Sequence, residues 1–256
     1  MAEPDRTKTA VKVTEIFKAF GRQAEWRLSE LSRELDLPTS VASRLLRTLV
    51  DSGFLEQPTA RGPYVLGPEL MAIAQIASRR RTLSSVSHRL LARLADRVQE
   101  ACDLCVLRGF RYITLDCVDP FHRVESALQL GDSAGLHAGA GGKAILAFQT
   151  DAFIHEVLSA PLLRLTENTF AEQHALLREL ETIREQGFAF SESEVTPGTC
   201  SLAVPVRDNA DRVVASVNVF TSAERMSAGR KADIVAMLIP AAQEMSKGIG
   251  GNWGGF

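Results

Sequence analysis

Long apolar runs and a cysteine framework are both missing from this chain of 256 residues. No stretch approaches the roughly 18 consecutive apolar residues that a membrane helix needs. The charged first six residues lack the apolar segment of a secretory signal. Four cysteines are too few for the disulfide framework of a secreted protein. We therefore expect a soluble, cytoplasmic protein.

A strong net charge is missing as well, since the formal charge is only −2. A composition of 45% hydrophobic and 23% charged residues is that of an ordinary globular protein and excludes disordered and fibrous classes. The charge is nevertheless uneven. Residues 1–81 hold 13 basic and 10 acidic residues, whereas the remainder has a net charge of −5. This asymmetry favours a polyanionic partner for the N-terminal third alone.

The N-terminal third has the pattern of a helix-turn-helix. Apolar residues at helical spacing predict a helix over 7–19. A second helix is expected over 29–35, capped by Ser29, and a third over 39–52, capped by Thr39 or Ser40. Pro38 must separate these two, because proline disfavours helical geometry in the residue before it. Two short helices joined by a tight break form the helix-turn-helix unit.

A wing and a linker helix are expected next. The runs 54–56 and 64–66 flank a turn-rich segment, which predicts a β-hairpin with Arg61 at its basic tip. Apolar spacing over 70–76 predicts a linker helix, and we place the domain boundary near residue 82.

The rest of the chain alternates strands and helices without a repeated βαβ series. The expected helices are 86–98, 143–148, 151–158, 171–186 and 231–246, and the expected strands are 104–107, 112–118, 124–130, 201–206 and 213–220. This order predicts an α+β protein with an antiparallel sheet and helices alongside it. The glycine-rich end, 248–256, is expected to be a flexible tail.

The third helix has the composition of a DNA-reading helix. Its leucines form one stripe, and its short polar and basic residues lie on the other side. The helix N-terminus favours a phosphate, and each arginine could donate two hydrogen bonds to a guanine. The alternative is that these arginines only solvate an amphipathic helix. The predicted DNA-binding residues are Thr39, Ser40, Ser43, Arg44, Arg47 and Arg61.

Motifs in both halves of the chain follow a pattern known from other proteins. The N-terminal motif is Leu28-Ser29-Glu30-Leu31, then 37–50, Leu-Pro-Thr-Ser-Val-Ala-Ser-Arg-Leu-Leu-Arg-Thr-Leu-Val, then Tyr64-Val65-Leu66-Gly67. The first C-terminal motif is Gly131, then Leu136-His137-Ala138, then Gly142-Lys143-Ala144-Ile145-Leu146-Ala147. The second is Glu194, then Gly198-Thr199-Cys200-Ser201-Leu202-Ala203-Val204-Pro205-Val206. Together these motifs resemble the IclR family of bacterial transcriptional regulators, and the resemblance covers residues 7–247.

The resemblance implies a winged helix-turn-helix domain over 1–67, a linker helix over 68–82 and a GAF-like effector-binding domain over 83–247. It further implies a homodimer or homotetramer that binds double-stranded operator DNA and a small-molecule effector, with no enzyme activity, cofactor or metal. The effector pocket it implies is lined by Arg123, Ser126, Ala134, Ala140, Gly141, Ser191, Thr199, Ser201, Asn218 and Phe220.

The chemistry of these residues favours a small carboxylate. Backbone N–H groups of Ala140 and Gly141 precede the helix expected at 143–148 and could receive a carboxylate. An inward-facing Arg123 would require an anionic partner, and Phe220 favours an aromatic one. The alternative is that Arg123, on an edge strand, faces water.

A serine hydrolase is the first rival function. Residues 131–135 match the Gly-x-Ser-x-Gly pattern around Ser133, with His155 or His174 as the base. That pattern requires a strand that leads directly into a helix, and the glycine-dense segment 135–142 is poor material for one. The second rival is a DNA-binding oligomer whose C-terminal domain senses nothing.

Phosphate-loop and zinc motifs are incomplete. Ala144 lacks the hydroxyl that would hold magnesium after Lys143. Cys102 and Cys105 have zinc-like spacing, but no second pair follows, and in a strand they would face opposite sides. We expect these cysteines to be buried small apolar residues, and His137 to be structural.

Overall fold

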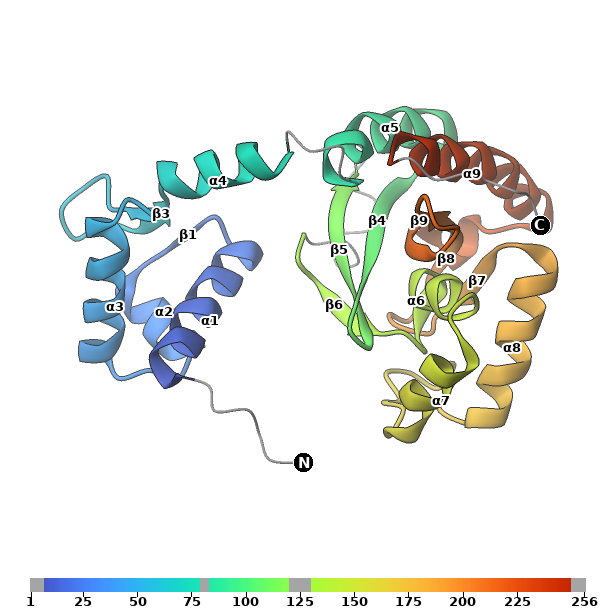
Figure 1. Ribbon diagram of the computed structural model, residues 1–256, viewed down its shortest axis with the longest axis horizontal. Coiled ribbons are helices and arrows are strands. Elements are labelled where there is room, and N and C mark those ends of the chain that lie inside the picture. Colours follow the sequence, from blue (N-terminus) through green and yellow to red (C-terminus); the bar gives the residue numbers. More distant parts are fainter. Residues whose placement is uncertain (1–6, 79–82, 120–129, 250–256) are drawn as a thin grey trace. The chain divides into compact units, whose positions relative to one another are not determined.

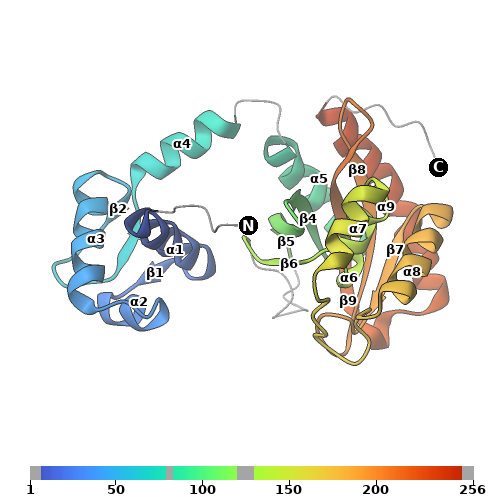
Figure 2. The same ribbon diagram turned by 60° about the horizontal axis from the view of Figure 1, so that its bottom comes forward.

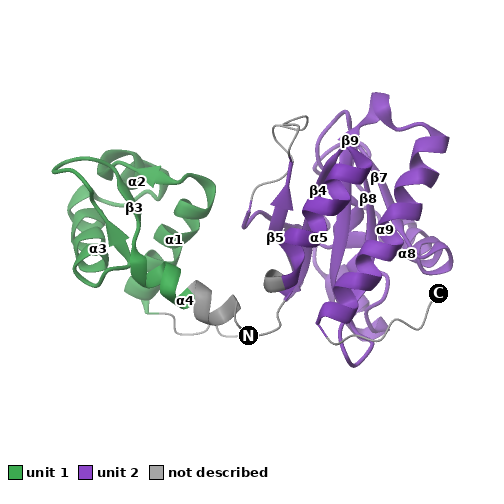
Figure 3. Cartoon of the chain, turned by 90° about the horizontal axis from the view of Figure 1, so that it is seen from above, with its two compact units in different colours: residues 1–80 green, residues 81–256 purple. Residues whose placement is uncertain are grey.

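The computed structural model describes residues 7–78, 83–119 and 130–249. The chain divides into two compact units, Met1–Arg80 and Arg81–Phe256 (Figure 3). Within the described residues, no helix is both long and apolar enough to cross a membrane.

The first unit packs the helices α1, α2 and α3 against a small antiparallel sheet with the strand order β1-β3-β2, and α4 follows the last strand. Its elements are α1 (Lys8–Arg22), β1 (Glu25–Trp26), α2 (Leu28–Glu34), α3 (Thr39–Asp51), β2 (Leu55–Glu56), β3 (Tyr64–Leu66) and α4 (Pro68–Ser78). The core collects Ile16, Phe20, Leu31, Leu46 and Leu55. The expected helices and hairpin are therefore present, in the expected order.

The predicted helix caps were wrong. α2 begins before Ser29, and the backbone N–H of Arg27 donates instead to the Glu30 carboxylate at 2.9 Å. The residue before α3 is Pro38, whose carbonyl accepts the Val41 N–H at 2.8 Å, and no side chain caps this helix. Thr39 is therefore already the first helical residue.

The second unit is built on one six-stranded antiparallel sheet with the order β6-β5-β4-β9-β8-β7. Its elements are α5 (Leu83–Val98), β4 (Ala101–Arg108), β5 (Arg111–Val118), β6 (Ser133–Gly135), α6 (Gly139–Leu146), α7 (Asp151–Ser159), α8 (Gln173–Gln186), β7 (Ala189–Glu192), β8 (Thr199–Arg207), β9 (Val213–Ser222), a short 3-10 turn (Ala223–Arg225) and α9 (Ala228–Gly248). The α+β prediction is confirmed.

Helices cover both faces of this sheet (Figure 1). α5 and α9 pack on one face, and α6, α7 and α8 lie on the other. Side chains along β4 point to both faces of the sheet, each of which has its own apolar core. Cys102 packs with α5 and α9, whereas Cys105 faces α6. The two cysteines therefore face opposite sides of the sheet, as expected.

Several details of the second unit differ from the sequence expectations. α6 begins at Gly139 rather than at Lys143, so that the glycine-dense segment is helical. β6 and β7 were not expected. All of the expected strand 124–130 except Leu130 lies outside the described residues, as does the tail beyond Ile249.

Candidate functional site

The exposed side of α3 is the first candidate site. Its apolar stripe, Ala42, Leu45, Leu46 and Leu49, is at most 7% exposed and packs into the core of the first unit. This stripe fixes the rotation of the helix, which lies along one edge of the unit (Figure 2). The opposite side of α3 is consequently turned to solvent.

The predicted DNA-binding residues lie mainly on that solvent side. Thr39, Ser40, Arg44 and Arg47 are exposed, whereas Ser43 is half-buried. Neither guanidinium group forms an ion pair or hydrogen bond with another described residue; the Arg44 carbonyl accepts from the Thr48 hydroxyl within the helix. Both guanidinium groups are therefore available to a ligand that approaches α3.

Arg61 lies at the tip of the hairpin between β2 and β3. It is exposed and has a φ of 63°, next to a turn closed by the Gly62 N–H and the Thr59 carbonyl at 2.8 Å. The paired strands set the register, with Leu55 opposite Leu66. The hairpin therefore presents a cation at its end, in the same unit as α3.

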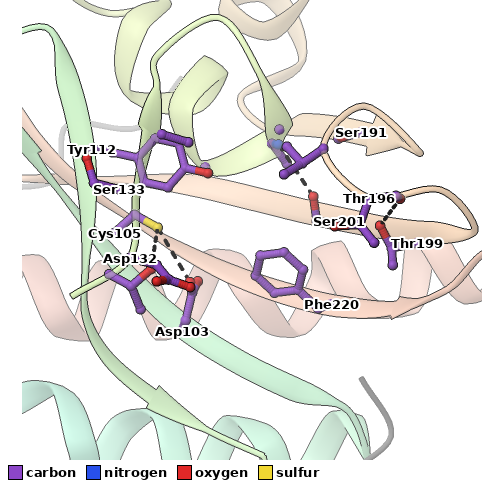
Figure 4. Close-up of a pocket in the computed structure, with 16 residues that line it drawn as sticks. Asp103, Cys105, Tyr112, Asp132, Ser133, Ser191, Thr196, Thr199, Ser201 and Phe220 are labelled. Carbon is purple, nitrogen blue, oxygen red and sulfur yellow. Dashed lines mark hydrogen bonds between the residues drawn. The ribbon is translucent and has the colours of Figure 1, made fainter. Parts of the chain in front are cut away.

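The second candidate site is a cavity of about 210 Å³ in the second unit. It lies between the N-terminus of α6 and the sheet (Figure 4). An engineered cavity of about 150 Å³ holds benzene, so this volume suits a ligand with one ring. The lining residues are Asp103, Cys105, Tyr112, Thr114, Asp132, Ser133, Ala134, Gly139, Ala140, Gly141, Ser191, Val195, Thr196, Thr199, Ser201 and Phe220.

Most of the predicted effector-binding residues meet in this cavity. Those that line it are Ala134, Ala140, Gly141, Ser191, Thr199, Ser201 and Phe220. Arg123 and Ser126 lie outside the described residues. Asn218 lies behind the lining, where its amide donates to Asp103 Oδ1.

The cavity has two chemically different sides (Figure 4). Asp103, Cys105 and Asp132 lie on one side of the Phe220 ring, and we call them, with Thr114, the acidic side. The hydroxyl side lies beyond the ring and consists of Ser191, Thr196, Thr199 and Ser201. A ligand that fills the cavity therefore meets carboxylates at one end and hydroxyls at the other.

Asp103 is the most unusual of the lining residues, because it is 1% exposed. Burial raises the pKa of its carboxyl group to about 7, although hydrogen bonds from Asn218, Cys105 and Thr114 act in the opposite direction. Burial also raises the pKa of the Cys105 thiol, so the thiol is a donor, 3.5 Å from Asp103 Oδ2. The Asp103 carboxyl group therefore has a pKa well above the usual range of an aspartate.

A buried ionic network holds the N-terminus of α6. Lys143 is 0% exposed, and its Nζ donates to Glu194 Oε1 at 2.6 Å, Glu179 Oε1 at 2.8 Å and the Phe190 carbonyl at 2.8 Å. The other oxygen of Glu194 accepts the Gly139 N–H at 3.1 Å. Burial raises the pKa of Glu194, and Lys143 opposes this shift. The network joins α6 to α8 and to the segment between β7 and β8.

Because of this network, not every backbone N–H group at the start of α6 is free to bind a carboxylate. Glu194 already occupies the Gly139 N–H. The Ala140 N–H donates to Ser201 Oγ at 3.4 Å, a length at which a ligand oxygen could replace the serine. An incoming carboxylate therefore meets Ala140 and Ser201 together.

Ser133 does not have the geometry of a hydrolase nucleophile. It lies in β6, and its hydroxyl accepts the Arg111 Nε–H at 2.8 Å. Its φ is not positive, although the residue in a nucleophile elbow occupies a strained turn between a strand and a helix. The structure thus contradicts the geometry that the serine hydrolase alternative required.

The sequence analysis did not predict three residues of the site, namely Asp103, Lys143 and Glu194. For Asp103 a signal was present, since it is the only charged residue in the run 101–107. Lys143 likewise precedes the apolar residues 144–148. Glu194 belongs to the last C-terminal motif of the family resemblance, but only the fold shows that it lies at the start of α6.

Comparison with known proteins agrees with these two units. Residues 9–59 match the IclR helix-turn-helix domain, and residues 75–247 match the family described as bacterial transcriptional regulator IclR C-terminal. The HTH-type transcriptional regulator Rv1719 of Mycobacterium tuberculosis is 33% identical over 211 residues, which cover 82% of this chain and 80% of that protein.

Solved structures show the same fold. The IclR protein of Thermotoga maritima has a TM-score of 0.77 at 27% identity and covers 96% of this chain and 100% of its own. An IclR homolog from Microbacterium hydrocarbonoxydans, crystallised with 4-hydroxybenzoate, has a TM-score of 0.80 at 24% identity and covers 94% of this chain and 99% of its own.

Proposed function

The chain belongs to the IclR family of DNA-binding bacterial transcriptional regulators, and we propose that a small carboxylate in the cavity of the second unit modulates its binding to operator DNA. The observation that carries the proposal is the cavity itself, which gathers seven of the predicted effector residues at the start of α6. A relative of the same fold was crystallised with 4-hydroxybenzoate, which supports the choice of a carboxylate.

The reading surface is the solvent side of α3 with the adjoining hairpin. In this proposal Arg44 and Arg47 contact base edges, each contributing about 1–3 kcal/mol of discrimination. Thr39 and Ser40 lie at the start of the helix, where backbone N–H groups bind phosphate. Ser43 contributes from the half-buried edge, and Arg61 contacts the DNA backbone or the adjacent minor groove.

The effector carboxylate is placed near Ala140 and Ser201, with Ser191, Thr199 and Gly141 around it. Ala134 and Phe220 supply apolar contact for the rest of the ligand. Arg123 and Ser126 complete the set that the family resemblance implies. If Arg123 binds the anion, an Arg123→Ala variant loses the thermal stabilisation that carboxylic acids give the wild-type protein; equal stabilisation of the two proteins contradicts that role.

The protein acts in this proposal as a homodimer or homotetramer on DNA. Two reading helices then enter successive major grooves, so the half-sites lie about 34 Å apart or a multiple of this. The effector changes operator affinity only to the extent that it binds one arrangement of the DNA-binding units better than another.

Operator binding tests the reading surface directly. The full chain selects its operator from random DNA, and fluorescence anisotropy then compares the wild type with Arg44→Ala and Arg47→Ala. Each variant is expected to bind the operator about 5–100-fold more weakly, because a bidentate contact is lost. Lys18→Ala is the control, since Lys18 is exposed on α1 and pairs with Glu15. Unchanged affinity in both arginine variants would overturn this placement of the reading surface.

A further inference from the structure

Asp103 has no role in the proposed binding of a carboxylate. It lines the cavity and yet is almost completely buried. Asn218 donates to Oδ1, the Cys105 thiol lies 3.5 Å from Oδ2, and Thr114 also hydrogen-bonds to the carboxyl group. All three partners are neutral, and the described lining residues include no lysine, arginine or histidine.

A buried carboxyl group without a cation is costly unless its hydrogen bonds are satisfied. A carboxylate can accept about four hydrogen bonds, so the partners of Asp103 leave acceptor capacity on the cavity side. A ligand group that meets Asp103 therefore gains most if it can donate a hydrogen bond.

A hydroxyl fits this position better than an ammonium group. Asp103 is 1% exposed, so an ammonium group bound there would have to lose its own hydration, which is costly. A hydroxyl can donate to the carboxylate without that cost and can also accept from the protonated form. A methyl or methoxy group donates to neither.

The two sides of the cavity define how such a ligand lies. Phe220 pairs with Ser201 across β8 and β9, and its ring lies between the acidic and hydroxyl sides (Figure 4). A carboxylate on the hydroxyl side consequently directs the far end of a one-ring ligand toward Asp103.

From this geometry we infer that Asp103 determines effector specificity by hydrogen bonding to a hydroxyl group of the ligand, so that the effector is a hydroxylated aromatic carboxylate. This inference rests on the proposed function, in which a carboxylate occupies the cavity. It adds a second recognition point, on β4, to the residues that the carboxylate itself contacts.

Calorimetric titration of the full chain tests the inference with matched ligands. The probes are benzoate, its 2-, 3- and 4-hydroxy derivatives and their methyl ethers, with 4-aminomethylbenzoate as the ammonium probe. We expect at least one hydroxybenzoate to bind about tenfold or more tightly than benzoate, since hydrogen bonds to charged groups contribute about 1.5–3 kcal/mol. Its methyl ether is expected to lose this advantage.

Two variants assign the preference to a residue. Asp103→Ala is expected to bind benzoate and the preferred hydroxybenzoate with affinities within about twofold of each other. Asp132→Asn tests the other, exposed carboxylate of the acidic side, and in this variant the ratio of the two affinities should stay at about tenfold. Asp233→Asn is the control, because Asp233 is exposed on α9, on the face of the sheet opposite to α6.

The remaining outcomes contradict the inference in distinguishable ways. If the wild type binds benzoate and all hydroxybenzoates equally, Asp103 selects no hydroxyl, although the proposed carboxylate function stands. If Asp132→Asn loses the preference for the hydroxybenzoate and Asp103→Ala keeps it, Asp132 and not Asp103 selects the hydroxyl group. Tighter binding of the ammonium probe overturns the choice of a hydroxyl. If no carboxylate binds, the proposed function fails and the inference fails with it.

Discussion

At the scale of single residues, the cavity is distinguished by polar groups that the sheet buries. Asp103 and Asn218 occupy opposed positions on β4 and β9, so their side chains meet on the same face. Ser216 lies next along that face and its hydroxyl contacts the Gly141 carbonyl at 3.1 Å. This row of hydrogen bonds leads from the cavity to the underside of α6 and fixes the position of the Asp103 carboxyl group.

The raised pKa of Asp103 predicts how folding stability depends on pH. A carboxyl group whose pKa is higher in the folded state stabilises the fold below its unfolded pKa and loses this contribution as pH rises to about 7. The titratable groups that face it, Cys105, Tyr112 and Cys117, have raised pKa values and stay neutral over this range. Asp132 is the remaining ionisable group in the lining.

An Asp103→Asn variant should therefore gain stability relative to the wild type as pH rises. Between pH 4 and pH 7.5 we expect the difference in unfolding free energy to move in favour of the variant by about 2–4 kcal/mol, since one pKa unit corresponds to about 1.4 kcal/mol. Urea denaturation at several pH values measures it. A difference that stays constant with pH would show that Asp103 titrates normally.

At the scale of elements, α6 shows what sequence reasoning could and could not predict. Amphipathic periodicity found the helices of the first unit, because each buries one stripe of apolar residues. The same reasoning predicts a later start for α6 than Gly139, because glycine disfavours a helix. A Cβ at Gly141 would lie 2.8 Å from Asn218 Oδ1, and one at Gly142 would lie 3.0 Å from the Leu136 carbonyl. Close packing therefore requires glycine at a place where local propensity disfavours it.

The cavity residues likewise divide into those that the sequence predicts and those that it does not. Family resemblance located the hydroxyl side, whereas Asp103 needed the pairing of β4 with β9 before its burial became visible. Glu194 lies 55 residues from Gly139 in the sequence, and no local pattern indicates their hydrogen bond. Contacts between distant elements were thus the part that the sequence alone could not predict.

A Gly141→Ala variant tests the close packing of α6. The added methyl group collides with Asn218, so we expect a loss of about 1–3 kcal/mol in unfolding free energy. Gly229→Ala is the matched control, because Gly229 is helical and nothing lies within 4 Å of its Cβ position. That control should be neutral or up to about 1 kcal/mol more stable. Equal effects of both substitutions in chemical denaturation would contradict the packing argument.

The Lys143 network should couple α6 to α8 and to the segment between β7 and β8. Lys143→Met leaves Glu194 buried without its cation, so we expect a loss of about 3–5 kcal/mol. The double variant Lys143→Met with Glu194→Gln removes both charges and should recover part of this loss. Thermal and urea unfolding compare the three proteins, and a double variant less stable than Lys143→Met alone would show that the two residues are not coupled in this way.

At the scale of the whole molecule, the chain combines a DNA-binding unit with a unit that contains a ligand-sized cavity. The two units are separate compact bodies with the boundary between Arg80 and Arg81. Regulation in this account is a coupling free energy between the cavity and the DNA-binding surface, typically about 1–3 kcal/mol for such systems. Linkage makes the coupling reciprocal, so operator DNA must change ligand affinity by the same factor as ligand changes operator affinity.

The most direct test measures operator affinity of the full chain with and without saturating ligand. Fluorescence anisotropy, with the selected operator and the tightest-binding hydroxybenzoate, should show a change in the operator Kd of about 5–150-fold. An unrelated DNA of the same length should show no such change. An operator Kd that is identical at zero and saturating ligand, with ligand binding verified by calorimetry, would contradict the account.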